Sequence, residues 1–335
     1  MKKKNLMKSL TALALSVLVV LSLAACGAKP SDGGKDEDKD GYTVAIIKQM
    51  DHASLDEIAD AIAARLDAIA QEQNVSIRYT ITSGQGDQSV LKQLADQAVA
   101  DQVDAIIPIA TTAAQVSAVA AEDSRTPVVY AAISDPDTAK LTGIDYVTGT
   151  SDALNTEYIL DMMLAQDPGV SKVGLLYSLS EPNSTKPIAE AKAYLDAKGI
   201  AYVEKTGNTN DEIMTAASSM VGQVDAVFTP TDNVVMAAAA AVSETLTKGG
   251  IPFYTGADSF VTAGAFATCG VNYTELGTYT ADMALDILET GVVPAYHVMD
   301  GGIITVNTET AAALGIDYSA FNDLAGQVVE VTTAE

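Results

Sequence analysis

Two stretches of this 335-residue chain follow one pattern: VDAIIPIATTAA at residues 103–114 and VDAVFTPTDNVV at residues 224–235. Each begins with Val-Asp-Ala, continues through an apolar run that contains a proline, and passes small polar residues before a segment suited to a helix. A short buried strand that leads directly into a helix is typical of such a pattern. The repetition indicates that one strand–helix unit is used in two similar domains.

The same alternation of strands and helices surrounds both copies. In the first half, apolar or β-branched runs predict strands at 43–47, 76–81, 104–110 and 127–132, with helices between them. The second half predicts strands at 172–177, 200–206, 225–230 and 251–257, with helices at 187–198, 211–221 and 233–248. This spacing predicts a parallel sheet in each half, covered by helices on both faces.

The remaining segments are expected to connect the two halves. Residues 143–150 and 264–273 predict strands, 274–291 predicts a long helix, and 295–299 predicts another strand. We therefore expect an α/β protein of two parallel-sheet domains joined by a three-crossing hinge, because nearly 300 residues exceed one ordinary core. The expected boundaries are 42–147 plus 273–294 for the N-terminal domain and 148–272 plus 295–335 for the C-terminal domain.

The N-terminus carries an export signal. Three lysines, residues 2–4, precede a long apolar run that ends in LAAC at 23–26, which predicts a signal peptide over 1–25. This ending resembles the lipobox of bacterial lipoproteins, and the resemblance implies that Cys26 is lipidated. An uncleaved anchor helix is the alternative, but the small residues at 24, 25 and 27 favour cleavage. Residues 26–41 then predict a lipidated cysteine and a flexible, charged tether.

Composition narrows the possible partners. The formal net charge is −25, so the chain repels phosphate backbones and is not expected to bind nucleic acid. Cys269 has no disulfide partner once Cys26 is assigned to lipid, and it is interpreted as a small buried residue.

Catalytic and cofactor motifs are not expected either. The chain has 2 histidines, His52 and His297, and no G-x-S-x-G sequence, although a hydrolase using paired carboxylates is an alternative that the sequence leaves open. GQGDQS, at 84–89, has Ser89 where a dinucleotide-binding motif needs its third glycine, and it follows the second strand instead of the first. We therefore predict no catalytic residue, no cofactor and no metal.

Several short motifs, in order, resemble one family. From Tyr42 to Asp317 the chain is similar to the substrate-binding lipoproteins of ABC transporters of the tryptophan/tyrosine type, which have a type I periplasmic-binding-protein fold. The resemblance implies an extracytoplasmic, membrane-anchored protein that closes around an aromatic amino acid and delivers it to a permease and its ATPase. The matching stretches are GQGDQS (84–89), VDAIIPIATTAAQ (103–115), PVVYAAISDP (127–136), VTGTSD (147–152), EPNS (181–184), VDAVFTPTDNVV (224–235) and NYTELG (272–277).

Two alternatives to transport of an aromatic amino acid stay open. The same closed form could report to a membrane receptor, and nothing in the sequence separates sensing from transport. A sugar or nucleoside is an alternative ligand, although a sugar cleft usually uses aromatic plates, and this chain has no Trp and 5 Phe.

An amino-acid ligand needs groups for its carboxylate, its ammonium and its side chain. Ligands bind beyond the carboxyl ends of parallel strands, so strand-end residues are the candidates. Thr111, Thr112, Asn183 and Ser184 begin helices and favour a carboxylate, with plain N-capping as the alternative. Asp232, between Thr231 and Asn233, is the first choice for the ammonium, with Asp258 and Asp135 behind it. The neighbours of Asp232, Thr231 and Asn233, belong to the predicted ligand-binding set, which Tyr177, Tyr273, His52 and Asp87 complete.

Overall fold

The computed structural model describes residues 41–325 and 328–334, and this described part forms one compact unit. The predicted signal peptide, Cys26 and all of the tether except Gly41 lie outside the described residues. Among the described helices, none combines the length and the apolarity needed to cross a bilayer.

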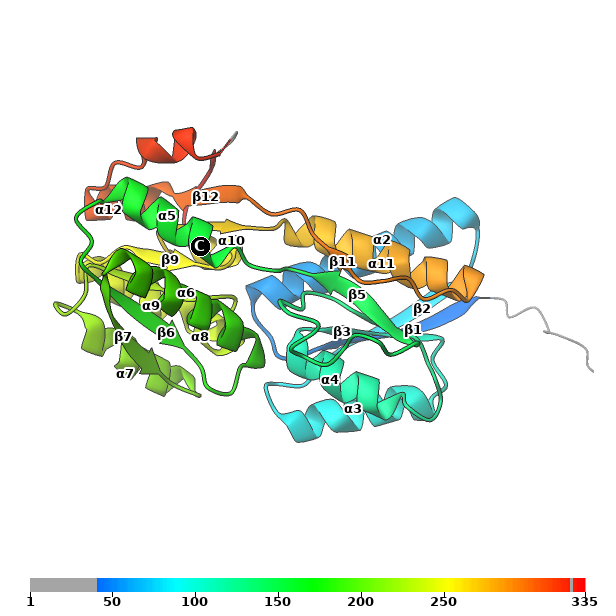
Figure 1. The fold of residues 1–335 in the computed structure, drawn as a ribbon. Coiled ribbons are helices and arrows are strands. Elements are labelled where there is room, and N and C mark those ends of the chain that lie inside the picture. The colour runs from blue at the N-terminus through cyan, green and yellow to red at the C-terminus, as the bar shows by residue number, and fades with distance from the viewer. Residues whose placement is uncertain (1–40, 326–327, 335) are drawn as a thin grey trace, which may run out of the picture. The chain divides into compact units, whose positions relative to one another are not determined.

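The first domain is built on a six-stranded sheet with the order β11-β5-β4-β3-β1-β2, in which every pairing is parallel. Helices α3 and α4 cover one face, while α2 and α11 cover the other (Figure 1). The strands are β1 (Tyr42–Lys48), β2 (Ile77–Ser83), β3 (Ala105–Ile109), β4 (Val128–Tyr130), β5 (Val147–Ser151) and β11 (His297–Val298). The helices are α2 (Ala53–Gln73), α3 (Gln88–Ala100), α4 (Thr111–Ala120) and α11 (Tyr273–Thr290).

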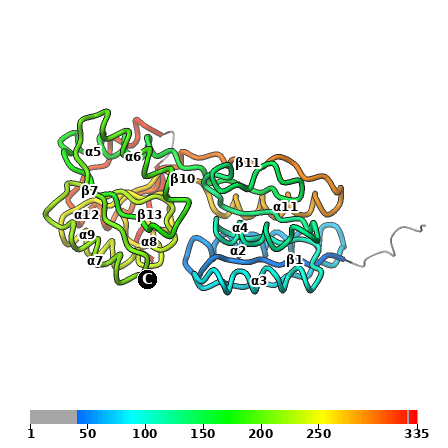
Figure 2. Tube along the Cα trace, turned by 60° about the horizontal axis from the view of Figure 1, so that its bottom comes forward, coloured from blue at the N-terminus to red at the C-terminus, as the bar shows by residue number. Residues whose placement is uncertain are grey.

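The second domain holds a seven-stranded sheet with the order β13-β12-β10-β9-β8-β6-β7, in which β12 runs antiparallel to β10. Figure 2 shows this domain beside the first, joined by the segments around β10 and β11. Its strands are β6 (Lys172–Tyr177), β7 (Ala201–Thr206), β8 (Ala226–Phe228), β9 (Phe253–Thr255), β10 (Ala267–Gly270), β12 (Ile303–Asn307) and β13 (Val328–Val331). Its helices are α5 (Thr156–Gln166), α6 (Thr185–Lys198), α7 (Asn210–Met220), α8 (Asn233–Ala237), α9 (Ala239–Lys248), α10 (Asp258–Thr262) and α12 (Thr308–Leu314). Two short 3-10 helices, Pro182–Ser184 and Ser319–Asp323, complete it.

The repeated Val-Asp-Ala stretch has the same structural role in both domains. β3 lies between β1 and β4, and β8 lies in the equivalent place between β6 and β9. Asp104 accepts a hydrogen bond from the backbone N–H of Thr43 at 2.8 Å. Asp225 likewise accepts from the backbone N–H groups of Ser171 and Lys172, at 2.8 and 2.9 Å. Each repeated aspartate therefore joins the third strand to the beginning of the first.

The chain crosses between the sheets three times, but two crossings fall later than expected. β5 pairs with β4, and β11 pairs with β5, so both belong to the first sheet. The first crossing therefore follows Ser151 instead of residue 147, and the third follows Val298 instead of residue 294. The second returns the chain to α11, which packs against α2 so closely that a Cβ on Gly277 would lie 2.7 Å from the Cβ of Ala61.

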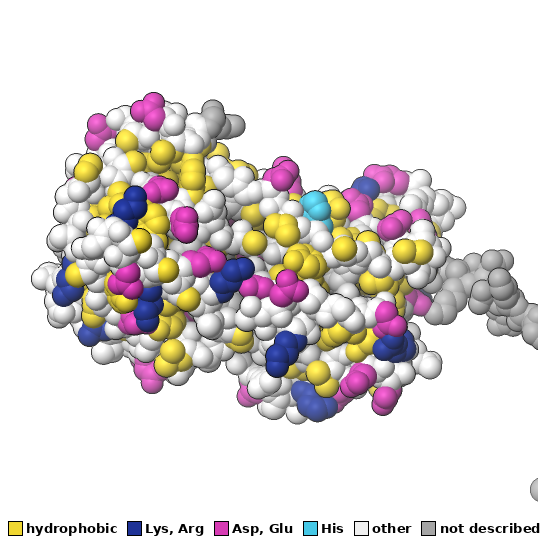
Figure 3. All heavy atoms as spheres, viewed as in Figure 1, with side chains coloured by type: hydrophobic (Ala, Val, Ile, Leu, Met, Phe, Trp, Pro, Cys, Tyr) yellow, Lys and Arg dark blue, Asp and Glu magenta, His cyan; other side chains and the backbone are white. Residues whose placement is uncertain are grey.

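Some elements differ from the sequence-based expectation. The helix expected over 233–248 is broken at Ala238 into α8 and α9, and α5, α10, β12 and β13 were not anticipated. Asn307 caps α12, because its side chain accepts a hydrogen bond from the backbone N–H of Thr310 at 2.9 Å. On the face drawn in Figure 3, Lys and Arg side chains lie among Asp and Glu, so the acidic excess does not gather there in one patch.

Candidate functional site

A pocket lies where the two domains meet, at the carboxyl ends of their strands. Its unfilled space is about 350 Å³, of which about 20 Å³ admits the centre of a water molecule, so it is narrow. The first domain lines it with His52, Ser54, Leu55, Ala110, Thr111, Ala132, Ser134, Asp152 and Tyr273. The second lines it with Asn183, Thr231, Asp232, Asn233, Met236, Ala257 and Phe260. The expectation that strand ends of both halves form one site matches this arrangement.

Hydrogen bonds join the domains directly around the pocket. They connect residues of one domain with residues of the other, so the domains are in direct contact here. The bonded pairs are Gln49 with Glu181 at 2.7 Å, His52 with Asn233 at 3.0 Å, Ser54 with Ser259 at 2.5 Å and Ser134 with Thr231 at 3.1 Å. At the rim, Lys186 forms an ion pair with Asp135 at 3.1 Å.

The N-terminus of α4 faces the pocket. The residue before the helix is Ala110, whose φ of 76° is rare for a residue with a side chain, and whose methyl group cannot cap the helix. Thr111 is 3% exposed and lines the pocket, while the backbone N–H of Thr112 donates to Oε1 of Gln49 at 3.0 Å. The N–H groups at a helix N-terminus favour negative charge, so this end of the pocket suits a carboxylate.

The corresponding helix of the second domain is capped internally. Asp232 is 0% exposed, and its Oδ1 accepts from the backbone N–H of Val235 at 3.0 Å. Its Oδ2 accepts from the backbone N–H of Ser178 and the hydroxyl of Ser184, both at 2.7 Å. Burial raises the pKa of Asp232. Both oxygens are thus engaged by the protein itself, which makes Asp232 a structural link between the ends of β6 and β8.

A second buried acid, Asp152, directly follows β5. Its Oδ1 accepts from the hydroxyl of Ser134 at 3.0 Å and its Oδ2 accepts from the hydroxyl of Tyr273 at 3.2 Å. Burial raises the pKa of Asp152, and both hydroxyl partners are neutral. Within the described residues this carboxyl has no ion pair. An unpaired acid in a buried pocket is suited to bind a cationic group.

The rest of the pocket is apolar or carries a hydrogen-bond relay. Leu55, Met236 and Phe260 supply large apolar side chains. The relay runs from Gln49 through Glu181 and Asn233 to His52, and the Nδ2 of Asn233 donates to Oε2 of Glu181 at 2.5 Å. Burial and the nearby Asp232 raise the pKa of Glu181 to about 8, and burial lowers the pKa of His52 to about 4.

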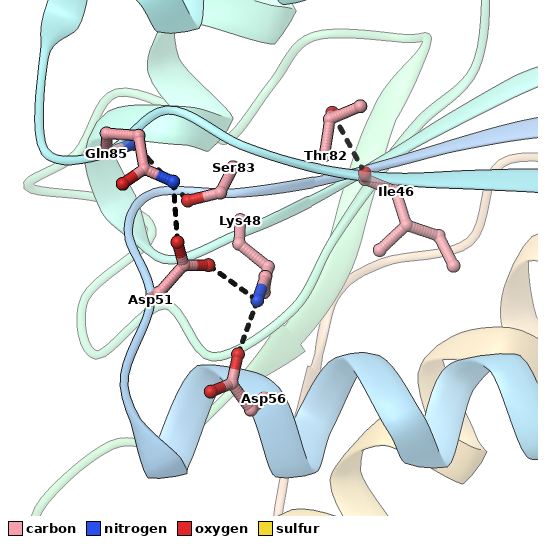
Figure 4. Close-up of polar contacts among 7 residues, drawn as sticks. All are labelled: Ile46, Lys48, Asp51, Asp56, Thr82, Ser83 and Gln85. Carbon is pink, nitrogen blue, oxygen red and sulfur yellow. Dashed lines mark hydrogen bonds and ion pairs between the residues drawn. The ribbon is translucent and has the colours of Figure 1, made fainter.

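An ion-pair cluster holds the loop that carries Gln49 and His52. Figure 4 shows the amine of Lys48 between the carboxylates of Asp51 and Asp56, at the junction of β1 and α2. Asp51 also accepts a hydrogen bond from the side-chain amide of Gln85 at 2.5 Å. The loop between these anchors is therefore held in place on both sides of His52.

The structure brings together seven residues of the predicted site. His52, Thr111, Asn183, Thr231, Asp232, Asn233 and Tyr273 all line the pocket. Thr112 and Ser184 lie directly behind it, bonded to Gln49 and Asp232.

Four predicted residues lie elsewhere, for identifiable reasons. Asp135 is engaged by Lys186, and Asp258 lines a different cavity beside β10 and β12. Tyr177 donates its hydroxyl to Glu204 on the neighbouring strand β7, at 2.7 Å. Asp87 caps α3 through the backbone N–H of Ser89 at 2.7 Å.

Sequence reasoning did not single out Asp152, Ser134, Gln49 or Glu181. A signal existed for Asp152, because the acid ends the VTGTSD strand and so occupies a strand-end position. Glu181 belongs to the EPNS motif, but its partner Gln49 comes from the other domain, and one sequence does not reveal that pairing. Among the described residues, no group of three or more His, Cys, Asp or Glu side chains is arranged to hold a metal ion.

Residues 43–328 match the family model for the ABC transporter substrate binding protein, and the chain belongs to this family. It has the type I periplasmic-binding-protein fold expected from its motifs. The family match also confirms the class of function expected from those motifs, capture of a substrate for an ABC transporter.

Individual relatives are similar over nearly the whole chain. A tyrosine-binding protein of Clostridioides difficile is 29% identical over 320 residues, which are 92% of each chain. The crystal structure of an ABC domain from Streptococcus pneumonia in complex with L-Trp is 29% identical, with a TM-score of 0.79 over 86% of this chain and 100% of the other. A ligand-free, open substrate-binding protein with adhesive properties from Clostridium difficile is also 29% identical, with a TM-score of 0.65 over 88% and 100%.

Proposed function

We propose that this protein is the lipid-anchored, extracytoplasmic receptor of an ABC importer and that its ligand is an aromatic amino acid. The observation that carries the ligand class is the pairing, in one pocket, of the N-terminus of α4, which has no charged cap, with the buried carboxyl of Asp152. A helix N-terminus suits the carboxylate of an amino acid, and Asp152 suits its ammonium. Leu55, Met236 and Phe260 would then surround the ring.

The relatives support an aromatic ligand. One is named a tyrosine-binding protein and another was crystallised with L-Trp. The pocket is also assigned to binding and not to catalysis, because the family consists of substrate-binding proteins.

Closure of the two domains would be the transport-competent step. At equal identity, the chain resembles the L-Trp complex (TM-score 0.79) more than the ligand-free, open relative (0.65). The hydrogen bonds that join Gln49 to Glu181 and His52 to Asn233 also support a closed arrangement. A ligand that contacts both domains stabilises such a form, and a permease with its ATPase would recognise it. The two domains move as units about the three crossings in this proposal.

A ligand screen tests the proposal. The chain from Gly27 onward is heated with single amino acids, sugars or nucleosides, and the largest rise in melting temperature is expected with tryptophan, tyrosine and phenylalanine. A melting temperature raised by sugars or nucleosides alone would refute the ligand class.

Two substitutions test the role of Asp152. Asp152→Asn should weaken amino-acid affinity roughly 100-fold, because the ligand ammonium loses its charged partner in a buried site. The matched control is Asp286→Asn on the exposed face of α11, which should bind like the wild type. Equal affinities for the two variants would remove Asp152 from the site.

The anchor is tested separately in cells. Cys26→Ser should leave the protein unlipidated and free of the membrane fraction after cell breakage. Incorporation of a labelled fatty acid into the variant as efficiently as into the wild type would contradict lipidation at Cys26.

A further inference from the structure

We propose that Nδ1 of His52 is the hydrogen-bond acceptor by which this protein selects, among aromatic amino acids, those whose ring carries an N–H or O–H donor. The inference rests on the proposed function and adds to it a residue that determines specificity. The imidazole lines the pocket, and its Nδ1 is buried without a hydrogen-bond partner among the residues that the structure describes. Buried polar atoms are nearly always paired, so an unpaired one in a binding pocket indicates a missing partner.

The relay determines which nitrogen of His52 carries the proton. The backbone N–H of Thr112 can only donate, so the side-chain oxygen of Gln49 faces it and the Gln49 amide nitrogen donates to Oε1 of Glu181. The amide nitrogen of Asn233 donates to the other oxygen of Glu181. The orientation of the side-chain amides of Gln49 and Asn233 therefore follows from the hydrogen bond to Thr112 at the N-terminus of α4.

The remaining bond fixes the tautomer. The oxygen of Asn233 faces Nε2 of His52 at 3.0 Å, so Nε2 must be the donor. Burial lowers the pKa of His52 to about 4, which keeps the ring neutral at physiological pH. A neutral ring with its proton on Nε2 has an unprotonated Nδ1. While Glu181 is ionised, the structure therefore presents an acceptor, and not a donor, at the unpaired position.

The surroundings of His52 place it beside the ring of the ligand. Leu55 follows His52 by three positions at the start of α2, and Met236 follows Asn233 by three positions on α8. Residues three apart on a helix lie on the same side, as Asn233 and Met236 do at α8, whereas His52 directly precedes α2. All four residues line the pocket. The acceptor consequently adjoins the apolar part, where the donor of an indole or a phenol would reach it.

This arrangement predicts the order of affinities. Tryptophan and tyrosine satisfy Nδ1 through the indole N–H or the phenol O–H, whereas phenylalanine leaves it unpaired. A site built to accept a hydrogen bond rejects an analogue that lacks the donor, because its buried acceptor is desolvated without compensation. Steric fit alone would not separate tryptophan from an isosteric analogue without the N–H.

Protonation of Glu181 would reverse the relay. With Oε1 occupied by the Gln49 donor, a proton on Glu181 must sit on Oε2 and donate to Asn233, whose amide then turns and donates to Nε2 of His52. The ring proton moves to Nδ1, which becomes a donor. Glu181→Gln imitates this state permanently, because its amide oxygen accepts from Gln49 and its amide nitrogen donates to Asn233.

The experiment is calorimetric titration of the chain from Gly27 onward with two matched ligand pairs, above pH 8, where Glu181 is mainly ionised. The pairs are tryptophan with its benzothiophene analogue, in which sulfur replaces the indole N–H, and tyrosine with phenylalanine. We expect the wild type to bind the donor-bearing member of each pair at least tenfold more tightly. His52→Gln keeps a nitrogen near the position of Nε2 but lacks Nδ1, so its two affinities should become equal through a loss for tryptophan alone. Glu181→Gln should also lower the ratio, while His297→Gln, at the other histidine, should retain it.

The outcomes separate this inference from the proposed function. If the wild type binds tryptophan and the benzothiophene analogue equally, the role of Nδ1 is refuted while the aromatic ligand stands. If it binds neither tryptophan nor tyrosine, the proposed function fails and the inference fails with it. A His52→Gln variant that keeps the wild-type ratio also refutes the inference. Should that variant not fold, the wild-type ratio and Glu181→Gln still decide.

Discussion

The two copies of the repeated strand–helix unit end differently. After β3 the chain turns directly into α4 through Ala110, whose φ is 76° and whose side chain cannot cap the helix; Gln49 accepts from the N–H of Thr112 instead. After β8 it passes through Thr231 and Asp232, and Asp232 caps α8 with its own carboxylate. One copy therefore leaves its helix N-terminus without a charged cap, and the other closes its N-terminus with a carboxylate. The two copies of the unit therefore line the pocket from opposite domains and have different roles there.

The largest expected effect comes from removing the carboxylate that caps α8. Asp232→Ala should lower the free energy of unfolding by about 3 kcal/mol, because Val235, Ser178 and Ser184 all lose a buried charged acceptor. Urea denaturation measures the change. Thr111→Ala in the first copy is the matched control and should cost less than about 1 kcal/mol. Equal losses in the two variants would contradict the assignment of different tasks.

The titration of Glu181 is a second difference between the two domains, because the one acid of the relay belongs to the second domain. The pKa of Glu181 is raised to about 8, so the carboxyl is mainly protonated at pH 6.5 and ionises as the pH rises. Tryptophan requires the ionised form, and its affinity should therefore rise roughly tenfold between pH 6.5 and pH 8, with release of a proton on binding below pH 8.

Two further titratable groups lie beside Glu181. His52 is joined to it through Asn233 and has a pKa of about 4, below this range. Burial raises the pKa of Asp232, against the hydrogen bonds it accepts from the chain. Calorimetry in buffers of different ionisation enthalpy counts the protons. Glu181→Gln should bind with little dependence on pH, and a slope unchanged in this variant would assign the proton to another group.

The smallest expected effect concerns the strained turn of the first copy. Ala110→Gly should raise the free energy of unfolding by about 1 kcal/mol, because glycine adopts a positive φ without strain. Thermal unfolding in the absence of ligand measures it. The same substitution at Ala238, which joins α8 to α9 in the second copy at a φ of −108°, should not stabilise the protein.

Much of the fold was predictable from sequence, because the side-chain pattern of each short segment indicates whether it forms a strand or a helix. The strands around Val44 and Val173 and the apolar stripe of α2 follow directly from side-chain periodicity. The hinge was less predictable, since β11 has only 2 residues and its place in the first sheet depends on pairing with β5. Short edge strands carry little local signal.

The candidate site was predictable in location but not in detail. Strand-end positions correctly indicated Thr111 and Asn183 as pocket residues. Sequence could not distinguish Asp232 from Asp152. The carboxylate of Asp232 caps its own helix, whereas the partners of Asp152 among the described residues are two hydroxyl groups. Both are acids after strands, and only burial and partner geometry separate them.

The narrowness of the pocket has a kinetic consequence. Space that admits little more than one water cannot take in an amino acid while the domains touch as they do here, so the domains must part for a ligand to enter. Exit of a bound molecule must then await separation of the domains, so the dissociation rate constant would be governed by the opening rate and would be nearly the same for every ligand that does not alter the cross-domain bonds.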